Sequence, residues 1–334
     1  MPASYKQIAK LLVTGLWLVL AIYGFYFVYE SIAGALNGEK DFYWPAFSVK
    51  NLVLLVSILL LMFVNWGIEA LKWQQSVKDI EKQSFFNAFK ATMVGVSVST
   101  WMPNRLGEYI GKIFYIQPQN RMRSAISGLY VSYTQIIATL FLGVLGAFYF
   151  LIKYGDAPNI SWVTGAIIGL LAIMLAFLIL KDRIINYLSV RNKYIKVFID
   201  TLTRYSFQQA RFFIGMSMLR VIVFTCQMVL ALELMGANAS VLDGFLLSWL
   251  IYGFQTIIPA TALAGLGIRM TLSAFFLGFA TSNELAIISA SYGIWMVNLL
   301  LPSALGWLAL IFSPVRAEVK HQVLQFVRLK RGKG

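Results

Sequence analysis

Long apolar runs constrain this chain more strongly than any other feature of its sequence. An α-helix needs roughly 20 residues to cross about 30 Å of hydrocarbon, and lipid offers its backbone no outside hydrogen-bond partner. Six runs reach that length: 11–30, 51–71, 124–151, 160–180, 212–236 and 285–313. The polar stretches between them include 31–50, 72–84 and 181–211. We therefore expect an all-α polytopic membrane protein with about six full spans.

The composition supports this class and argues against several others. Hydrophobic residues make up 59% of the chain and charged residues 13%, against about 25% charged in a typical soluble domain. The single cysteine, Cys226, rules out an internal disulfide framework, and the single histidine, His321, lies in the polar tail. Zinc sites built on histidine, Ser-His or Cys-His catalysis, and a Gly-x-x-x-x-Gly-Lys phosphate loop therefore have no basis in the membrane segments. We expect no cofactor, no metal ion and no enzymatic activity.

Two further apolar regions, 85–118 and 244–281, are broken near the middle. The first contains TWMPNRLGE at 100–108, and the second contains TIIP at 256–259 and AGLGIR at 264–269. In each, a Thr-x-x-Pro ends an apolar run, and a Leu-Gly pair with a nearby arginine follows. The arms, of about 13–17 residues, are short for full spans but suit half-crossings. We expect two re-entrant hairpins, whose irregular backbone needs surrounding protein or a water-filled cavity.

The basic residues predict the orientation of the chain. If each hairpin enters and leaves the membrane on the same side, most of the 28 lysines and arginines fall in cytoplasmic segments. Only Lys40, Lys50 and Lys153 fall in external segments, and the others lie within the membrane segments. A full span at 85–101 would place basic segments in opposite compartments, against the positive-inside rule. The run 11–30 is too long for a typical signal peptide, so we interpret it as a span. We expect a multi-pass protein of the cell membrane with both termini cytoplasmic.

This topology makes the two halves of the chain equivalent in order and opposite in direction. Residues 1–152 give span, span, hairpin and span from the cytoplasm, and residues 153–334 give the same order from outside. An inverted-topology repeat of this kind brings two broken segments together near the membrane midplane, where such transporters bind their substrates. We expect a first repeat at 1–152 and an inverted second repeat at 153–334 that ends in a basic cytoplasmic tail.

Charged and helix-breaking residues at membrane depth mark a candidate substrate site. A charge there costs about 2.5–3.5 kcal/mol on insertion scales and needs partners or water. Arginine forks and helix N-termini both favour phosphate, and glycine permits close backbone approach. The candidate substrate-binding residues are Asn104 (as a helix N-cap), Arg105, Gly107, Glu108, Lys112, Arg220, Gly265, Gly267 and Arg269.

These residues also have structural alternatives. Glu108 and Lys112 are spaced i, i+4 and could neutralise one another on a helix. Arg220 could snorkel or pair with a neighbour, and Arg269 could tie its hairpin to the bundle. Glycines in membrane helices serve helix packing more often than phosphate binding. Glu69 lies at the end of a span and is expected to be interfacial.

Two of these segments resemble a known family. PNRLGE at 103–108, and Pro259 followed by GLGIR at 265–269, are similar to the flippase-like transmembrane region of lysylphosphatidylglycerol synthases and its stand-alone relatives. The resemblance covers nearly the whole chain and implies movement of an anionic or modified lipid between leaflets. Because the chain ends shortly after its last span, we expect a stand-alone member without the soluble aminoacyltransferase domain. Ala264 replaces a glycine of the family pattern and Met270 a glutamate, so the second hairpin lacks an acid.

Three classes of function fit these observations. The favoured one is a lipid transporter, a flippase or scramblase for a phosphate-bearing lipid or lipid-linked glycan carrier. Its partners would be the membrane, an anionic phospholipid or lipid-linked headgroup, and a separate lipid-modifying enzyme that supplies the cargo. The second class is an integral-membrane lipid-modifying enzyme, and the third is a non-catalytic scaffold for a separate lipid synthase. The basic loop 181–211 is expected to face anionic lipid, and we expect no nucleic-acid binding.

Overall fold

The structure, a computed structural model, describes residues 47–99, 106–155, 204–258 and 262–311, together with Pro45 and isolated positions between 156 and 203. The predicted span at 11–30, nearly all of the one at 160–180, and both hairpin tips lie outside these ranges. Within the described ranges every regular element is helical, which confirms the predicted all-α class.

Four of these helices are long and apolar enough to cross a membrane, as a multi-pass membrane protein requires. They match four of the six predicted runs, each with bounds that differ by a few residues. They are α2 (Val49–Val77), α5 (Arg121–Tyr154, preceded by the short turn η2, Pro118–Asn120), α8 (Phe207–Leu234), and the continuous helix formed by α11 (Glu284–Trp295), η3 (Met296–Leu300) and α12 (Leu301–Ile311).

Each of the two broken apolar regions forms a pair of shorter helices, as the breaks predicted. The pairs are α3 (Phe85–Ser99) with α4 (Leu106–Ile113), and α9 (Val241–Ile257) with α10 (Ala262–Leu277). α3 and α4 run antiparallel in backbone contact, because a Cβ on Gly107 would lie 2.6 Å from the nitrogen of Ser99 and one on Gly95 would lie 2.6 Å from the carbonyl oxygen of Glu108. No side chain larger than hydrogen fits at these two positions.

The ends of the helices follow from local sequence. Ser48, Ser206, Ser240 and Asn283 each accept a hydrogen bond from a backbone N–H in the first turn of the helix that follows, as N-cap residues do. α8 ends where Gly236 adopts φ 70° and the N–H of Ala237 donates to the carbonyl of Leu232 at 2.9 Å. This is a Schellman C-cap, and glycine adopts its left-handed turn without a Cβ penalty.

Helix α11–α12 contains one turn of π-helix, η3, at its centre. Pro302 lies two residues after this turn. A proline has no backbone N–H and clashes with the carbonyl four residues earlier, here that of Asn298, which lies within η3. A widened turn relieves that clash. The turn places the Asn298 side chain, 5% exposed, in the protein interior.

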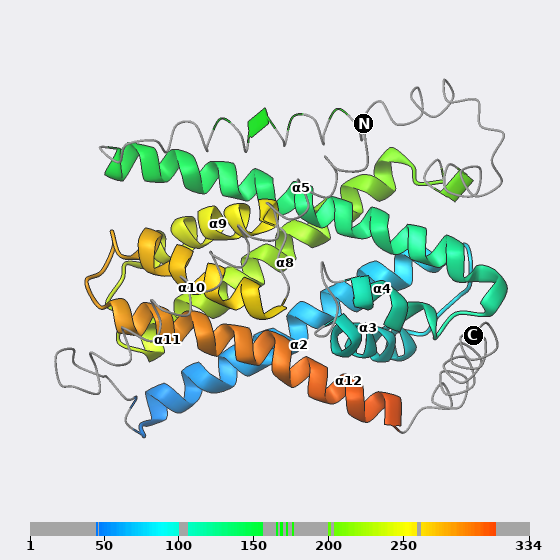
Figure 1. Cartoon of the computed structure of the whole chain (residues 1–334), viewed down its shortest axis with the longest axis horizontal. Coiled ribbons are helices and arrows are strands. Elements are labelled where there is room, and N and C mark those ends of the chain that lie inside the picture. The colour runs from blue at the N-terminus through cyan, green and yellow to red at the C-terminus, as the bar shows by residue number, and fades with distance from the viewer. Residues whose placement is uncertain are drawn as a thin grey trace, which may run out of the picture.

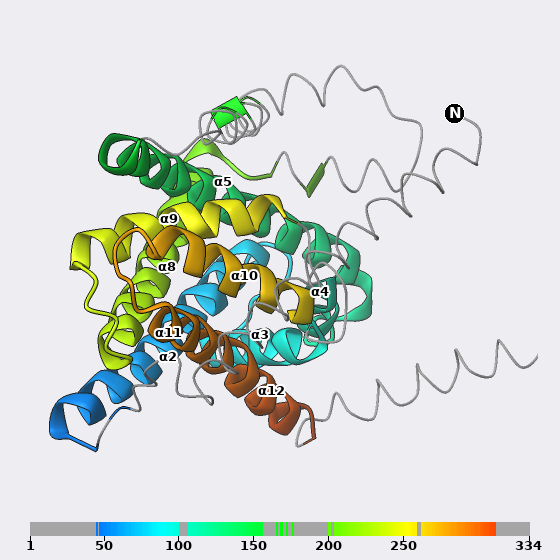
Figure 2. The same ribbon diagram turned by 60° about the vertical axis from the view of Figure 1, so that its left-hand side comes forward.

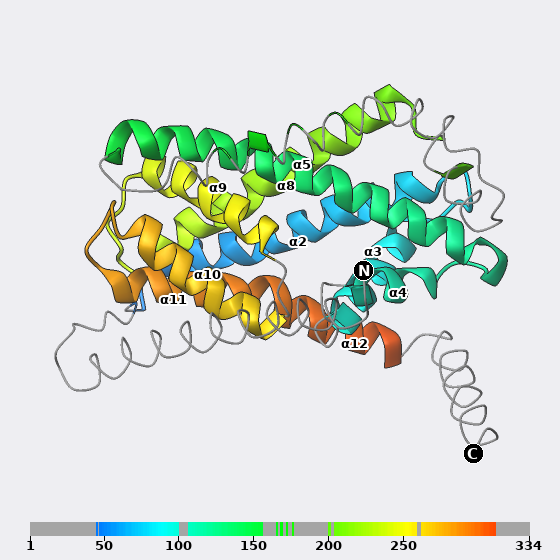
Figure 3. The same cartoon turned by 45° about the horizontal axis from the view of Figure 1, so that its top comes forward.

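The two sets of helices interlock in a reciprocal manner. The order long helix, helical pair, long helix occurs twice along the described chain, as α2, α3/α4, α5 and as α8, α9/α10, α11–α12. Figure 1 shows the pair α9/α10 toward one end of the long axis and the pair α3/α4 toward the other. The last long helix of each set packs along the first helix of the other pair, α5 on α9 and α12 on α3, while α2 packs on α8 (Figure 2 and Figure 3).

Glycines allow both of these reciprocal contacts. On α5, a Cβ at Gly143 would lie 2.9 Å from the Cα of Gly253, and one at Gly146 would lie 2.7 Å from the nitrogen of Leu250, both on α9. On α12, a Cβ at Gly306 would collide with the carbonyl oxygen of Met93 on α3. Close backbone approach through small residues is a main source of helix association in membranes. Lipid tails are as apolar as the helix surfaces, so the hydrophobic effect does not drive the helices together there.

We therefore predict that Gly146→Ala destabilises the protein. The new methyl group meets the α9 backbone, which cannot move aside alone, so the free energy of unfolding should fall by about 1–3 kcal/mol. Thermal unfolding in detergent measures the change. Gly215→Ala on α8 is the matched control, since its Cβ would meet nothing within 4 Å. Equal stability of the two variants would contradict the packing role of Gly146.

Candidate functional site

One face of α2 carries a row of buried polar side chains. Asn65, Glu69 and Lys72 are spaced i, i+4 and i+7, which places them on the same side of the helix. They are 0%, 3% and 0% exposed, respectively, so this side of α2 points into the protein. Elsewhere α2 exposes apolar side chains such as Leu60 and Phe63, the surface expected to face lipid.

Glu69 is the centre of a set of ion pairs that joins three helices. Its Oε1 lies 2.8 Å from Nζ of Lys112 on α4, and its Oε2 lies 3.0 Å from Nη1 of Arg220 on α8 and 3.4 Å from Nζ of Lys72. The expectation of an interfacial Glu69 at a span end is therefore wrong. The reason is that α2 continues to Val77, two turns beyond Glu69, and helices α4 and α8 cover the carboxylate.

Glu108 and Lys112 form the i, i+4 ion pair considered from the sequence, with Oε1 of Glu108 2.8 Å from Nζ of Lys112. Lys112 is thus shared between two carboxylates, and its ammonium also lies 5.6 Å from the ring centre of Trp73. The Glu108 side chain is 13% exposed, against 3% for Lys112. Lys112 therefore does more than neutralise Glu108, because its ammonium also holds α4 to α2 through Glu69.

Arg220 pairs with its neighbours rather than snorkelling to the surface. Its Nε donates to Oδ1 of Asn65 at 2.8 Å, in addition to the Glu69 contact. The guanidinium lies 5.0 Å from the ring centre of Trp66 and 5.6 Å from that of Phe224. Carboxylate, amide and aromatic faces together replace the hydration that this cation loses.

Lys72 lies in the protein interior, not in a cytoplasmic loop as the sequence suggested. Its Nζ donates to Oε1 of Gln135 on α5 at 2.8 Å. The polar connector after the second predicted span therefore begins later than residue 72, because α2 keeps its helical hydrogen bonds through this lysine. Lys72 therefore contributes a positive charge to the interior, and it no longer belongs to the basic residues predicted in cytoplasmic segments.

We refer to Glu69, Lys72, Glu108, Lys112 and Arg220 as the buried charge cluster. It holds three cations and two carboxylates, so its formal charge is one unit positive. In a low-dielectric interior an uncompensated unit charge is costly, and either the loss of a lysine proton or a bound anion neutralises it. The cluster draws on α2 and α4 from the first set of helices and on α8 from the second, so it lies where the two sets meet.

A chain of amide side chains extends from the cluster into the centre of the protein. Nδ2 of Asn65 donates to Oδ1 of Asn298 in η3 at 3.2 Å. Nδ2 of Asn298 donates to Oε1 of Gln227 at 3.1 Å, and Nε2 of Gln227 donates to the carbonyl of Ile58 at 2.9 Å. We refer to Asn65, Asn298 and Gln227 as the amide ladder. It links α2, α8 and the π-turn in one hydrogen-bonded series.

The remaining predicted site residues do not belong to the buried charge cluster or the amide ladder. Asn104 and Arg105 lie outside the described residues, so their roles stay predictions. Gly107 serves close packing of α4 against α3, which is the structural alternative. Arg269, on α10, donates from Nε to Oε1 of Gln255 on α9 at 3.3 Å and lines a cavity separate from the cluster. Gly265 lies in the first turn of α10 and Gly267 in the second. The carbonyl of Gly267 accepts a hydrogen bond from the hydroxyl of Thr271 at 3.0 Å.

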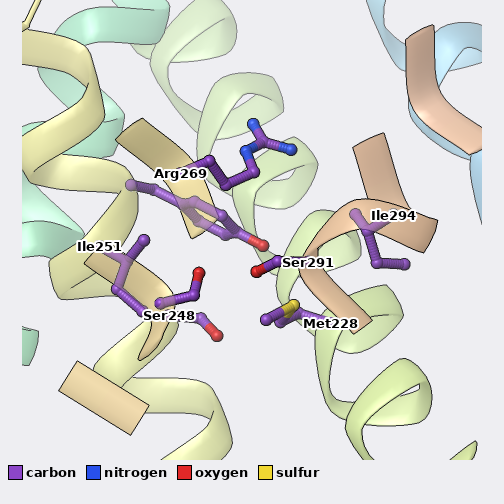
Figure 4. A pocket seen from close by; sticks show the side chains of 8 residues that line it. Met228, Ser248, Ile251, Arg269, Ser291 and Ile294 are labelled. Atoms are coloured by element: carbon purple, nitrogen blue, oxygen red, sulfur yellow. The ribbon is translucent and has the colours of Figure 1, made fainter. Parts of the chain in front are cut away.

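The cavity at Arg269 has a volume of about 10 Å³, room for about one water molecule, and lies between α8, α9, α10 and α11 (Figure 4). Its lining residues are Met228, Ser248, Ile251, Tyr252, Arg269, Ser273, Ser291 and Ile294. Drug-sized ligands occupy pockets of about 300–1,000 Å³, so this cavity is far too small for a lipid headgroup. In the described ranges no group of three or more His, Cys, Asp or Glu residues is placed to hold a metal ion.

A second polar cluster fixes the opposite end of the helix bundle. Asp243, in the first turn of α9, accepts from Nζ of Lys153 at 2.7 Å and from the hydroxyl of Tyr149 at 2.7 Å, both on α5. Lys50 and Glu233 pair at the same end, 2.6 Å apart, and are exposed. At the other end, Glu81 accepts from the backbone nitrogen of Gln117 at 3.1 Å. These contacts place polar groups at both ends of the helix bundle.

Comparison with known proteins assigns no family to the chain: no family model, no curated protein and no solved structure matches it.

Sequence reasoning missed Glu69, Lys72 and the amide ladder as parts of the site. The available signal was the i, i+4, i+7 spacing of Asn65, Glu69 and Lys72 at the end of an apolar run, which places three polar groups on one helix face. The boundary drawn by hydropathy at residue 71 falls within this row, between Glu69 and Lys72, so the row was not recognised as one face of a helix. The isolated amides Gln227 and Asn298 within apolar runs gave a second, weaker signal.

The cluster predicts unequal effects of neutralising its two carboxylates. Glu69→Gln leaves three buried cations facing Glu108 alone, and should lower the free energy of unfolding by about 3–5 kcal/mol. Glu108→Gln should cost less, because Lys112 keeps Glu69 as a partner and Glu108 is more exposed. Chemical or thermal unfolding in detergent measures both.

The matched control is Glu233→Gln, which removes an ion pair at the protein surface and should change stability little. If Glu69→Gln were as mild as Glu233→Gln, Glu69 would not hold the three helices together.

Proposed function

We propose that the chain is an integral-membrane lipid transporter, a flippase or scramblase that moves a phosphate-bearing lipid or a lipid-linked glycan carrier between leaflets. The observation that carries this proposal is the buried charge cluster, with one surplus positive charge enclosed by helices long and apolar enough to span a membrane. A phosphate diester carries one negative charge, which matches the surplus. A membrane protein that binds such an anion at depth gives a lipid headgroup a path across the apolar core.

The proposed architecture is an inverted-topology repeat with cytoplasmic termini. Support comes from the repeated order of long helix, helical pair and long helix, and from the reciprocal packing of α5 on α9 and α12 on α3. In this proposal α3/α4 and α9/α10 are re-entrant hairpins that open from opposite faces. Alternating movement of the two sets of helices around their shared centre would expose that centre first to one side and then to the other.

In the proposed mechanism the headgroup phosphate enters beside α4. Arg105 and Asn104 precede this helix in the sequence, and the N-terminus of a helix attracts anions. Glu108 is the most exposed member of the buried charge cluster, and it follows Arg105 by three residues. A phosphate that reaches Lys112 would compete with Glu108 for the ammonium, so cargo binding would loosen the tie between α4 and its surroundings.

The resemblance to the flippase-like region of lysylphosphatidylglycerol synthases supports a lipid as cargo. One residue, Met270, indicates that the two helical pairs do not have equivalent roles. Met270 stands where the family pattern has a glutamate. It is 4% exposed and packs with Leu266 and Ile288 in an apolar cluster. The second helical pair therefore has no counterpart of Glu108 at this position. That observation favours the scaffold for a separate lipid synthase as the second candidate function, and a transport assay separates the two.

The proposal predicts that Glu108→Gln combined with Lys112→Gln gives a folded but inactive protein. Both charges of the pair disappear together, Glu69 keeps Lys72 and Arg220, and Gly107 keeps α4 packed on α3, so the variant should lose some stability through the missing Lys112–Glu69 contact but still fold. Translocation of a fluorescent anionic phospholipid, measured in proteoliposomes by a leaflet-specific quencher, should fall at least tenfold.

The matched control is Lys50→Gln combined with Glu233→Gln, which removes an ion pair from the exposed end and should leave translocation unchanged. Wild-type translocation by the Glu108/Lys112 double variant would remove the cluster from the transport path. No translocation by the wild-type protein, for any anionic lipid tried, would favour the scaffold.

The proposed topology predicts the labelling of single cysteines. In a Cys226→Ala background, Lys78→Cys and Gln117→Cys should react with an impermeant thiol reagent only from the cytoplasmic side, and Ser282→Cys only from outside. All three positions are exposed. Opposite-side labelling of Lys78→Cys and Gln117→Cys would exclude a re-entrant α3/α4 hairpin and the inverted repeat with it.

A further inference from the structure

The end of the helix bundle near α3 and α4 carries exposed cations. α2 ends there, and α3, α5 and α8 begin there (Figure 1). The hydroxyl of Tyr205, just before α8, donates to the carbonyl of Ser76 on α2 at 2.8 Å, which holds these segments together. The exposed basic residues of these segments form no ion pair with a carboxylate among the residues that the structure describes. We refer to them as the basic rim: Lys78, Lys82, Lys90, Arg123 and Arg211.

The charge of the basic rim is not balanced locally. The end of α2, the connector to α3, and the first two turns of α3, α5 and α8 carry two carboxylates, Asp79 and Glu81. Two carboxylates against five cations leave three surplus positive charges. At the opposite end, both cations that the structure describes, Lys50 and Lys153, lie within 2.7 Å of a carboxylate oxygen. The uncompensated charge is therefore a property of one end of the bundle.

Two members of the basic rim lie over exposed phenylalanines. On α3, Nζ of Lys90 lies 4.9 Å from the ring centre of Phe86, and on α8 the guanidinium of Arg211 lies 5.4 Å from that of Phe207. The two rings are 65% and 73% exposed. A cation beside an exposed ring at the end of a helix is typical of the boundary between hydrocarbon and headgroups, where apolar and charged groups both find partners.

Arg211 lies on a face of α8 that is suited to contact lipid. Phe207, Arg211, Gly215, Leu219 and Ile222 are all exposed, and steps of four, four, four and three residues keep them on one side of the helix. α8 is one of the four helices long and apolar enough to span a membrane. A cation at the end of such a face lies at the depth of the lipid headgroups.

We infer that the basic rim binds the anionic phospholipid headgroups of the leaflet around it, as an interaction surface separate from the buried charge cluster. Arg211 and Lys90 would contact the headgroup phosphates, and Phe207 and Phe86 would lie among the first groups of the acyl chains. An acidic protein segment would balance the charge, but it would leave the exposed rings and the apolar face of α8 without a partner. The inference requires that the chain lies in a membrane and does not rest on transport.

Competition between lipids at the protein surface tests the inference. The purified full-length protein is reconstituted in phosphatidylcholine, and electron spin resonance compares the association of spin-labelled phosphatidylglycerol with that of spin-labelled phosphatidylcholine. The wild type should prefer phosphatidylglycerol by about threefold or more, and added salt should weaken the preference because it screens exposed charges. In Lys90→Gln/Arg211→Gln the preference should fall by about twofold or more, since each basic side chain near an anionic surface adds to lipid binding.

Lys50→Gln is the matched control for the single variant Arg211→Gln. Each removes one exposed positive charge, but Lys50 lies at the opposite end and is already balanced by Glu233. Arg211→Gln should therefore lower the preference for phosphatidylglycerol more than Lys50→Gln does. Equal effects of the two variants would contradict the basic rim as the binding surface. Equal association of both lipids with the wild type would overturn the inference and leave an acidic protein segment as the partner.

A further variant separates these lipids from the proposed cargo. Glu108→Gln/Lys112→Gln should keep the preference for phosphatidylglycerol, because this pair belongs to the buried charge cluster and not to the basic rim. Loss of the preference in this variant, with none in Lys90→Gln/Arg211→Gln, would assign the bound lipid to the cluster and overturn the inference. Because the readout needs no transport, the basic rim can bind lipid while the proposed translocation fails, and the reverse.

Discussion

The ion pairs of Glu69 are the interaction on which the rest of the structure depends. One carboxylate holds cations from three helices, Lys72 of α2, Lys112 of α4 and Arg220 of α8. An unpaired charge is costly in lipid, and these residues gain their ion-pair partners only when the helices assemble. The short helix α4, of eight residues, is too short to be stable by itself, and the Lys112 contact fixes it to α2.

Glycine contacts and buried charges make different contributions to helix assembly. Glycines on α5, α12 and α4 bring backbones into direct contact and so set the distances between helices. The charges and the amide ladder then fix which helices meet, because a buried polar group is satisfied in only one arrangement. The proposed transport function assigns the surplus cation at the centre of this arrangement to the binding of an anion.

The sequence predicted the class of the fold and much of the element order, but less of the site. Apolar length identified four long helices and two broken regions, since the thickness of a bilayer sets that length. Of the candidate site residues, Glu108, Lys112 and Arg220 do meet, yet they meet through Glu69, which the sequence placed at an interface. Arg269 lies apart from them, beside a small cavity that Ser248 and Ser291 also line, and a serine in an apolar run gives no signal in the sequence.

The sequence by itself determined that this chain forms apolar helices, where two of its apolar regions break, and that several charges lie deep among them. These properties are local, because they follow from residue hydropathy, from proline and glycine, and from the requirement that a backbone in lipid satisfies itself. Only the tertiary structure decided which charges pair. Residues as distant as Glu69 and Arg220 meet through the packing of α2 on α8, and no local rule specifies that contact.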